Sequence, residues 1–142
     1  MKAYTDIEQS KKLSEILPPE SADMARCGGE NVIMTDYISA KKKFSVCGEL
    51  TITPCWSLSA LINLLPSEFT LENKFGTFKY TVHIRKYKIT EDEDVYQIAY
   101  GNYKYYENGS SSWKDMINTG EKEELLDAVF EMVIWLKENY KL

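Results

Sequence analysis

An alternation of apolar and polar residues from Thr77 to Arg85 is the clearest pattern along the chain. Alternation over this length is typical of a strand that buries one face. His83 falls on the polar phase, so we expect it on the wetter face of the strand. The apolar phase, which we expect to face the core, contains Phe78, Tyr80, Val82 and Ile84.

A hairpin is expected directly after this strand. Residues 86–90 continue the strand pattern with a change of register, and the four acids from Glu91 to Asp94 read as a loop. Residues 95–100 form the next apolar run. If the acidic loop is a hairpin tip, the second run pairs antiparallel with the first.

The aromatic segment that follows predicts a second hairpin. Gly101-Asn102 indicates a break, after which residues 103–106 continue the strand. Asn108-Gly109 is a strong turn signal, and we expect residues 110–113 to return as a short edge strand.

The N-terminal half contains weaker strand signals. Residues 18–30 read as a connecting loop, and residues 31–38 and 44–52 as strands, with a bulge at Gly48. Lys41 to Lys43 lie between these two runs. Such a triplet is typical of a solvated turn, with phosphate contact as the alternative.

Three segments show helical spacing of apolar residues, and we expect helices near residues 6–17, 54–65 and 121–140. Thr5 and Glu8 match a capping box for the first helix. Pro54 suits the first position of the second helix, after Thr53 as its cap. The sequence from Asn118 to Glu121 can act as a capping box for the third helix.

The order of these elements predicts an α+β fold. Runs of strands between separated helices favour a mostly antiparallel sheet of four to six strands, covered on one face by about three helices. The chain has 142 residues, of which 44% are hydrophobic. This size and composition fit a single globular domain spanning residues 1–142.

Charge and targeting signals narrow the classes of function. The formal net charge is −5, which argues against a protein that coats nucleic acid. The sequence shows neither the apolar run of a signal peptide nor the longer run of a membrane span, so we expect a cytoplasmic protein.

The residues for catalysis or metal binding are few. Cys27, Cys47, Cys55 and His83 formally make a zinc set, but their spacings are not those of structural zinc sites. We therefore expect no metal and no cofactor, and small buried cysteines instead. As an alternative to a binding role, His83 acts as a base beside a cysteine or a carboxylate in a small enzyme.

The tyrosines are the most unusual feature of the composition, because half of the ten lie between residues 96 and 106. Tyrosine packs well between paired strands, and it is also enriched at protein interfaces. Both interpretations stay open. If the segment is a recognition surface, its contact residues are Tyr100, Tyr103, Tyr105, Tyr106 and Trp113.

Three segments carry a resemblance to a known group. They are residues 4–24, residues 54–66 and residues 127–138. Together they resemble small uncharacterised proteins of gut Bacteroidales that often lie in prophage or other mobile-element regions. The resemblance implies a bacterial cytoplasmic setting and a mobile-element origin, and it implies no activity or site residue.

Three classes of function follow in order of preference. The first is a non-enzymatic binding or accessory protein that contacts a protein partner through the aromatic surface. The second is the small enzyme with a cleft near His83. The third is a nucleic-acid role through the basic residues 41–43 and 85–88.

Overall fold

The structure, a computed structural model, describes residues 1–28, 31–44 and 51–140. The chain divides into two compact units, Met1–Leu64 with Val133–Leu142, and Leu65–Met132. Each is described by itself. That residues 1–142 form a single domain stays a prediction.

The fold is α+β, as the sequence predicts, but it has two antiparallel sheets and four α-helices within the described residues. The first unit contains a three-stranded sheet in the order β2-β1-β3, and the second contains a four-stranded sheet in the order β4-β5-β6-β7. The strands therefore divide between two sheets instead of forming the single sheet expected, and one helix is added to the three expected. None of the helices described here has the length and apolar character needed to cross a membrane.

In the first unit, two helices pack on the small sheet. The helices are α1 (Ile7–Ile16) and α2 (Tyr37–Phe44), and both contact the edge strand β3 (Ile52–Cys55). The central strand is β1 (Met24–Cys27), with β2 (Asn31–Ile33) on its other side. The described part of residues 1–64 also contains a 3₁₀ turn, η1 (Pro19–Ser21), and the short helix α3 (Leu58–Leu64).

Helix α1 confirms the first predicted helix but not its cap. Asp6, rather than Thr5, is the N-cap residue, and it forms the capping box with Gln9. Thr5 is fully buried, and its hydroxyl bonds to Ser10 and accepts the backbone N–H of Trp56. The Thr5 side chain therefore fixes the N-terminal segment to β3 instead of capping the helix.

Between residues 18 and 44 the predicted order of loop and strand is wrong. Residues 24–27 form the central strand β1 inside the expected loop, and residues 37–44 form α2 where a strand and a turn were expected. Asp36 starts this helix, because its side chain accepts the backbone N–H of Ser39. Lys41 to Lys43 therefore lie on a helix. The expected bulge at Gly48 lies outside the described residues.

The second predicted helix begins later than expected. Residues 52–55 belong to β3, and Pro54 is opposite Ala25 of β1. Proline is tolerated there because β3 is an edge strand, where one side of the backbone needs no partner. Ser57 caps the helix in place of Thr53, since its hydroxyl accepts the N–H of Ala60.

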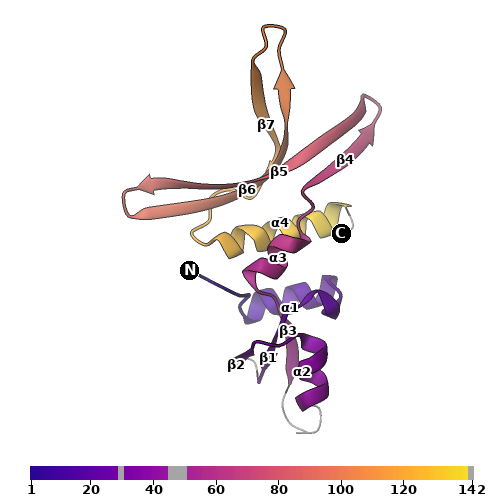
Figure 1. Ribbon diagram of the computed structural model, residues 1–142, viewed down its shortest axis with the longest axis vertical. Coiled ribbons are helices and arrows are strands. Elements are labelled where there is room, and N and C mark those ends of the chain that lie inside the picture. The colour runs from indigo at the N-terminus through magenta and orange to yellow at the C-terminus, as the bar shows by residue number, and fades with distance from the viewer. Residues whose placement is uncertain (29–30, 45–50, 141–142) are drawn as a thin grey trace. The chain divides into compact units, whose positions relative to one another are not determined.

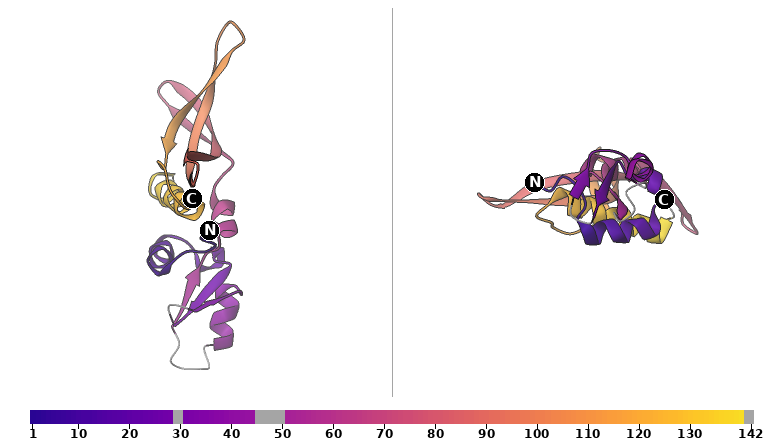
Figure 2. Two further views of the ribbon diagram at one scale, coloured as in Figure 1. Left: turned by 90° about the vertical axis from the view of Figure 1, so that its left-hand side faces the viewer. Right: turned by 90° about the horizontal axis from the view of Figure 1, so that it is seen from below.

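The second unit is a meander of long hairpins. Its strands are β4 (Glu68–Asn73), β5 (Gly76–Thr90), β6 (Glu93–Tyr105) and β7 (Ser111–Asn118). Figure 1 shows that the three hairpins leave the sheet in different directions, and Figure 2 shows the β6–β7 hairpin as an extended two-stranded ribbon. The expected hairpin at Glu91–Asp94 and the turn at Asn108-Gly109 are confirmed. The register does not change directly after residue 85, and a shift occurs only between Lys88 and Thr90.

Two expectations for these strands are wrong. Gly101-Asn102 does not break β6, because the irregularity lies in β7, where Met116 is an extra residue opposite the Tyr100–Gly101 step. Strand β7 has 8 residues, twice the length of the edge strand expected at residues 110–113. On β5, Phe78, Tyr80 and Val82 are only half-buried, and Ile84 is 47% exposed.

The last helix, α4 (Leu125–Tyr140), begins four residues after the expected start. Lys122 forms a β-bridge with Tyr96, with backbone hydrogen bonds of 2.7 and 2.9 Å, and this bridge holds the preceding segment extended. Gly120 has a φ of +70°, and Asn118 accepts its N–H, so Asn118 caps a turn rather than a helix.

Candidate functional site

A cluster of four rings lies on one face of the β5–β6–β7 sheet. We call it the ring cluster: His83, Tyr103, Tyr105 and Trp113. The His83 and Trp113 rings are stacked, with centroids 3.5 Å apart and planes at 12°. The Tyr103 and Trp113 rings pack edge to face, with centroids 5.1 Å apart. The centroids of Tyr103 and Tyr105 are 6.3 Å apart. Strand register places these residues together, because Tyr103 is opposite Trp113 and both share a face with Tyr105.

Gly101 makes room for the Trp113 ring. A Cβ atom on Gly101 would lie 2.8 Å from Trp113 Cζ2 and 2.2 Å from the Lys114 carbonyl oxygen, and both separations are too short. The absent side chain therefore lets the indole lie flat against β6. Gly101, which the sequence predicts to be a strand break, is instead the position over which the Trp113 ring packs.

A polar network fixes the orientation of the indole. Trp113 Nε1 donates to Asp115 Oδ1 at 2.5 Å. Arg85 donates to both oxygens of Asp115, at 2.6 and 3.0 Å, and also to Gln97 at 3.0 Å. The Arg85 guanidinium is the main reason that the pKa of Asp115 falls to about 2. Asp115 therefore stays ionised. Its carboxylate accepts hydrogen bonds from the Trp113 indole and from the Arg85 guanidinium, so Arg85 fixes Asp115 and Asp115 fixes Trp113.

The expected site residues divide into two groups. Tyr103, Tyr105 and Tyr106 are exposed, and Trp113 is half-buried, all on the β6–β7 hairpin. Tyr100 is fully buried, its hydroxyl donates to the Pro66 carbonyl at 2.6 Å, and burial raises its pKa. Tyr100 is therefore a core residue. His83 and Arg85 belong to the aromatic site, although the sequence interpretation assigned them to the enzyme and nucleic-acid alternatives instead.

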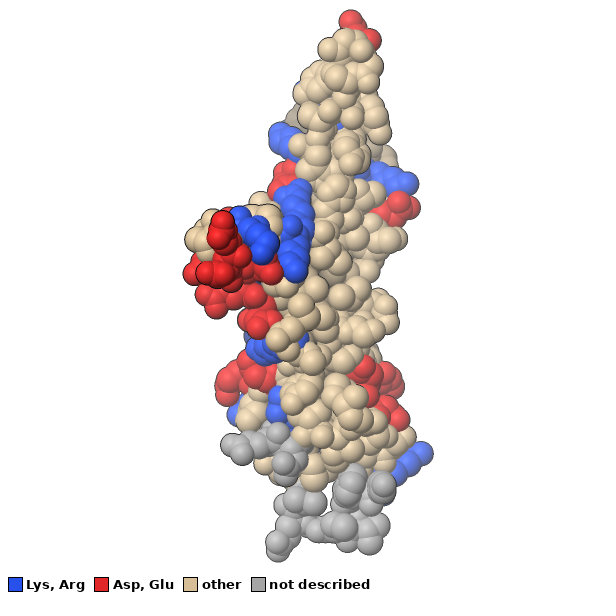
Figure 3. Space-filling view, turned by 60° about the vertical axis from the view of Figure 1, so that its left-hand side comes forward, with Lys and Arg blue, Asp and Glu red and all other residues tan. Residues whose placement is uncertain are grey.

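The β6–β7 hairpin beyond the core has a distinctive composition. We call residues 101–115 the arm. From Gly101 to Trp113, every residue except Lys104 and Glu107 is Tyr, Trp, Ser, Asn or Gly. Figure 3 shows acidic atoms at the tip of this hairpin and an uncharged surface below it. Large rings among small polar residues are the composition of antibody loops, in which the rings supply contact area at low entropic cost.

The aromatic residues of β6 change face where the strand leaves the core. Tyr96, Ile98 and Tyr100 are buried on one face of the strand. Tyr103 and Tyr105 have the opposite phase and are exposed. Additional rings that packed on the same side of the core as Tyr100 would lie at even-numbered positions of β6. This change of phase at Gly101 is the sequence signal that separates Tyr100 from Tyr103 and Tyr105, whereas Tyr106 keeps the phase of Tyr100 and is exposed beyond the end of β6.

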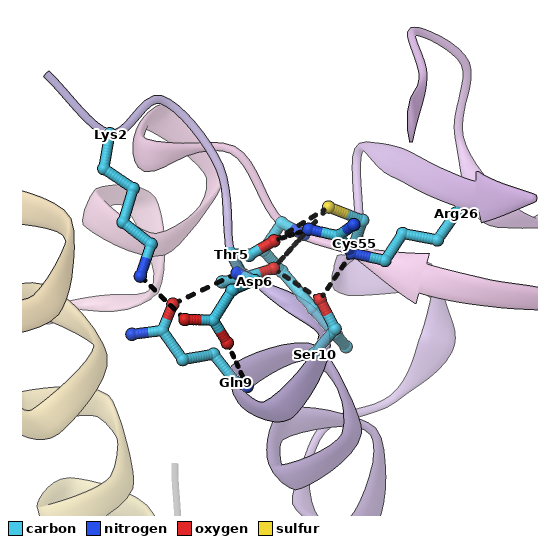
Figure 4. A network of polar contacts seen from close by, with 8 residues as sticks. Lys2, Thr5, Asp6, Gln9, Ser10, Arg26 and Cys55 are labelled. Carbon is cyan, nitrogen blue, oxygen red and sulfur yellow. Dashed lines mark hydrogen bonds and ion pairs between the residues drawn. The ribbon is translucent and has the colours of Figure 1, made fainter. Parts of the chain in front are cut away.

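A buried polar network in the first unit has a structural role. Figure 4 shows Arg26 of β1 reaching the start of α1, where it donates to the Thr5 carbonyl oxygen and to Ser10 Oγ. Cys55 is fully buried beside Thr5, with its Sγ 3.6 Å from the Thr5 hydroxyl oxygen. These contacts join α1 to the sheet. Lys2 pairs with Asp6 at the rim of the same network.

Two surface grooves are lined by residues outside the ring cluster. One, of about 650 Å³ in the first unit, is lined mainly by apolar side chains that include Met24, Met34 and Ile62. The other, of about 440 Å³, lies at the β5–β6 tip among carboxylates such as Glu93 and Glu121. Neither groove contains a set of three or more described side chains arranged to hold a metal ion.

The described contacts of His83 are with the rings of Trp113 and Tyr103. The cysteines with a described position, Cys27 and Cys55, belong to the first unit. Catalysis near His83 therefore stays a prediction that no described contact supports.

The chain was compared with protein-family models, with curated proteins and with solved structures, and none of the three comparisons gave a match. The resemblance to Bacteroidales proteins stays a prediction. Function is therefore inferred from the geometry and chemistry of the ring cluster.

Proposed function

We propose that this protein is a binding protein that recognises another protein through the arm. The observation that carries the proposal is the exposure of Tyr103 and Tyr105 beside Trp113, on the outer part of the β6–β7 hairpin beyond the buried residues of β6. Exposed rings that are clustered and held in place are typical of the centre of a protein interface.

The fixed position of Trp113 supports recognition rather than simple surface exposure. Its indole is stacked on His83, seated on Gly101 and hydrogen-bonded to Asp115. An ordered ring loses little entropy when a partner covers it, so its burial contributes more to affinity. Trp, Tyr and Arg are also the residues most often found at binding hot spots.

Charge favours a protein over a nucleic acid as the partner. Basic and acidic residues are equal in number in the first unit, so the formal net charge of −5 belongs to residues 65–132, which include the arm. The arm itself carries two cations, Lys104 and Lys114, and two anions, Glu107 and Asp115, so it lacks the net positive charge that attracts phosphates, which supply most of the affinity in non-specific nucleic-acid binding. The resemblance to mobile-element proteins directs the search for a partner to a bacterium and its phages.

The test is affinity capture from the cells that produce the protein, with quantitative mass spectrometry of the captured proteins. We expect the double variant Tyr103→Ala/Tyr105→Ala to lose at least tenfold of one specific partner. The matched control is Phe75→Ala, because Phe75 is an equally exposed ring (78%) on the β4–β5 hairpin. Equal capture by the wild type and the double variant would refute the proposal.

A further inference from the structure

The two faces of the arm differ in chemistry. The ring face carries Tyr103, Tyr105 and Trp113. The opposite face, here the lysine face, carries Lys104, Tyr106 and Lys114. On that face Lys104 Nζ lies 5.9 Å from the Tyr106 ring centroid, and the Tyr106 hydroxyl lies 3.0 Å from Ser112 Oγ.

Both faces are exposed along the outer part of the arm. Tyr105 is 77% exposed on the ring face, and Tyr106 is 47% exposed on the lysine face. Lys104 and Lys114 are also exposed. A flat partner surface covers only one face of a two-stranded ribbon, whereas a cleft covers both. The presence of large rings on both faces therefore favours a cleft.

The charges specify the two walls of that cleft. The exposed part of the ring face, formed by residues 103, 105, 111 and 113, has no charged side chain. Arg85 and Asp115, at the base of this face, are paired with each other. The lysine face has two cations at successive levels of the hairpin, since Asn102 is opposite Lys114 and Lys104 is opposite Ser112. Charge complementarity pairs such a face with carboxylates.

Resting on the proposed function, we infer that the arm is held inside a cleft of a folded protein partner. One wall of the cleft is uncharged and apolar and packs against Tyr103, Tyr105 and Trp113. The other wall is acidic and faces Lys104 and Lys114. Insertion of a rigid hairpin into a concave surface is also the way in which long loops of single-domain antibodies bind.

The test uses a photo-crosslinking amino acid, benzoylphenylalanine, placed in the full-length protein in the cells that produce it. The crosslinker replaces Tyr105 in one sample and Tyr106 in another, and Phe75 in the control. These three residues are exposed aromatics, so the replacement is conservative at each. We expect both arm positions, and not the control, to crosslink to the same protein at peptides from two different walls of one cleft.

A charge-reversal experiment tests the acidic wall. We expect Lys104→Glu/Lys114→Glu to weaken capture of that partner at least tenfold at low salt, with a smaller effect at high salt. The control Lys74→Glu/Lys79→Glu changes the net charge equally on another hairpin. We expect it to leave capture within twofold of the wild type.

The outcomes separate this inference from the function on which it rests. Crosslinks from position 105 alone, with no effect of the lysine reversals, would refute the cleft and leave recognition through the ring face intact. Crosslinks to a second copy of the chain or to nucleic acid would also refute it. If neither arm position crosslinks above the control, and Tyr103→Ala/Tyr105→Ala captures normally, both proposals fail.

Discussion

Asp115 joins the largest number of described interactions at the ring cluster. It accepts hydrogen bonds from Arg85, Trp113 and Asn118. Its carboxylate therefore couples a cation on β5 to the indole on β7. A residue so placed is a positioning residue for the cluster, because it touches Trp113 but lies behind the exposed rings.

The low pKa of Asp115 predicts a pH dependence of stability. The pKa of about 2 lies below the ordinary value of 3.8, so ionised Asp115 stabilises the folded protein above about pH 4. This contribution is lost as the pH falls toward 2. We expect Asp115→Asn to lower the free energy of unfolding by about 1 kcal/mol at pH 7, because the pair is partly exposed to water. The difference from the wild type should shrink between pH 4 and pH 2.

Urea unfolding at a series of pH values measures this effect. Glu107→Gln is the control, because it removes one negative charge from the exposed turn of the same hairpin. A constant difference between Asp115→Asn and the wild type across the acid range would contradict the assignment of the pH dependence to Asp115.

At the level of elements, the β6–β7 hairpin combines a buried base with an exposed outer part. Its base is anchored through Ile98 and Tyr100, which are fully buried. From Tyr103 to Ser112 every described side chain is exposed. Exposed residues contribute little burial free energy to the fold. We therefore expect the outer arm to be dispensable for folding.

Shortening the hairpin tests this separation of folding from binding. We replace residues 104–112 with Asn-Gly, a two-residue turn that keeps Tyr103 opposite Trp113. We expect the melting temperature to change by less than about 5 °C, because only exposed residues are removed. Circular dichroism measures the melting, and the capture assay should show complete loss of the partner. A cooperative unfolding transition that disappears would show that the outer arm is needed for the fold.

The accuracy of the sequence interpretation varied between elements for physical reasons. The β5–β6 hairpin was predictable because it is stabilised locally, by alternation and by a polar turn. The start of α4 was not, because Lys122 pairs with Tyr96, a contact between residues distant in sequence. Strand β1 was missed because it is short and contains no β-branched or aromatic residue, and its place depends on pairing with both neighbours.

The candidate site was predictable in part. The tyrosine-rich segment was visible in the sequence, and three of its rings are exposed on the arm. The change of phase at Gly101 could separate Tyr100 from Tyr103 and Tyr105, but not from Tyr106, which has the same phase as Tyr100. His83 and Arg85 join the cluster through strand pairing across β6, which no local pattern in the sequence reveals.

At the level of the whole molecule, α4 contributes residues to both units. Residues 125–132 of this helix belong to the second unit and residues 133–140 to the first. A helix forms cooperatively, so loss of one half destabilises the other. This continuity supports the prediction that the chain unfolds as one domain.

Two tryptophan indoles report the two units separately. Trp56 Nε1 donates to Ser21 in the first unit at 2.9 Å, and Trp113 Nε1 donates to Asp115 in the second. We expect their N–H signals in a ¹⁵N NMR spectrum to disappear at the same urea concentration, as in a two-state transition. Midpoints that differ by more than about 0.5 M would instead show two independently folding domains.

The change of phase at Gly101 also separates two sets of positions for protein engineering. Side chains on the outer arm can be randomised without altering Tyr96, Ile98 or Tyr100, which belong to the core. A display library with varied residues at 103, 105, 106 and 112 would keep the folded scaffold and Gly101 constant. The hairpin then becomes a site at which new binding specificities are selected on an unchanged protein.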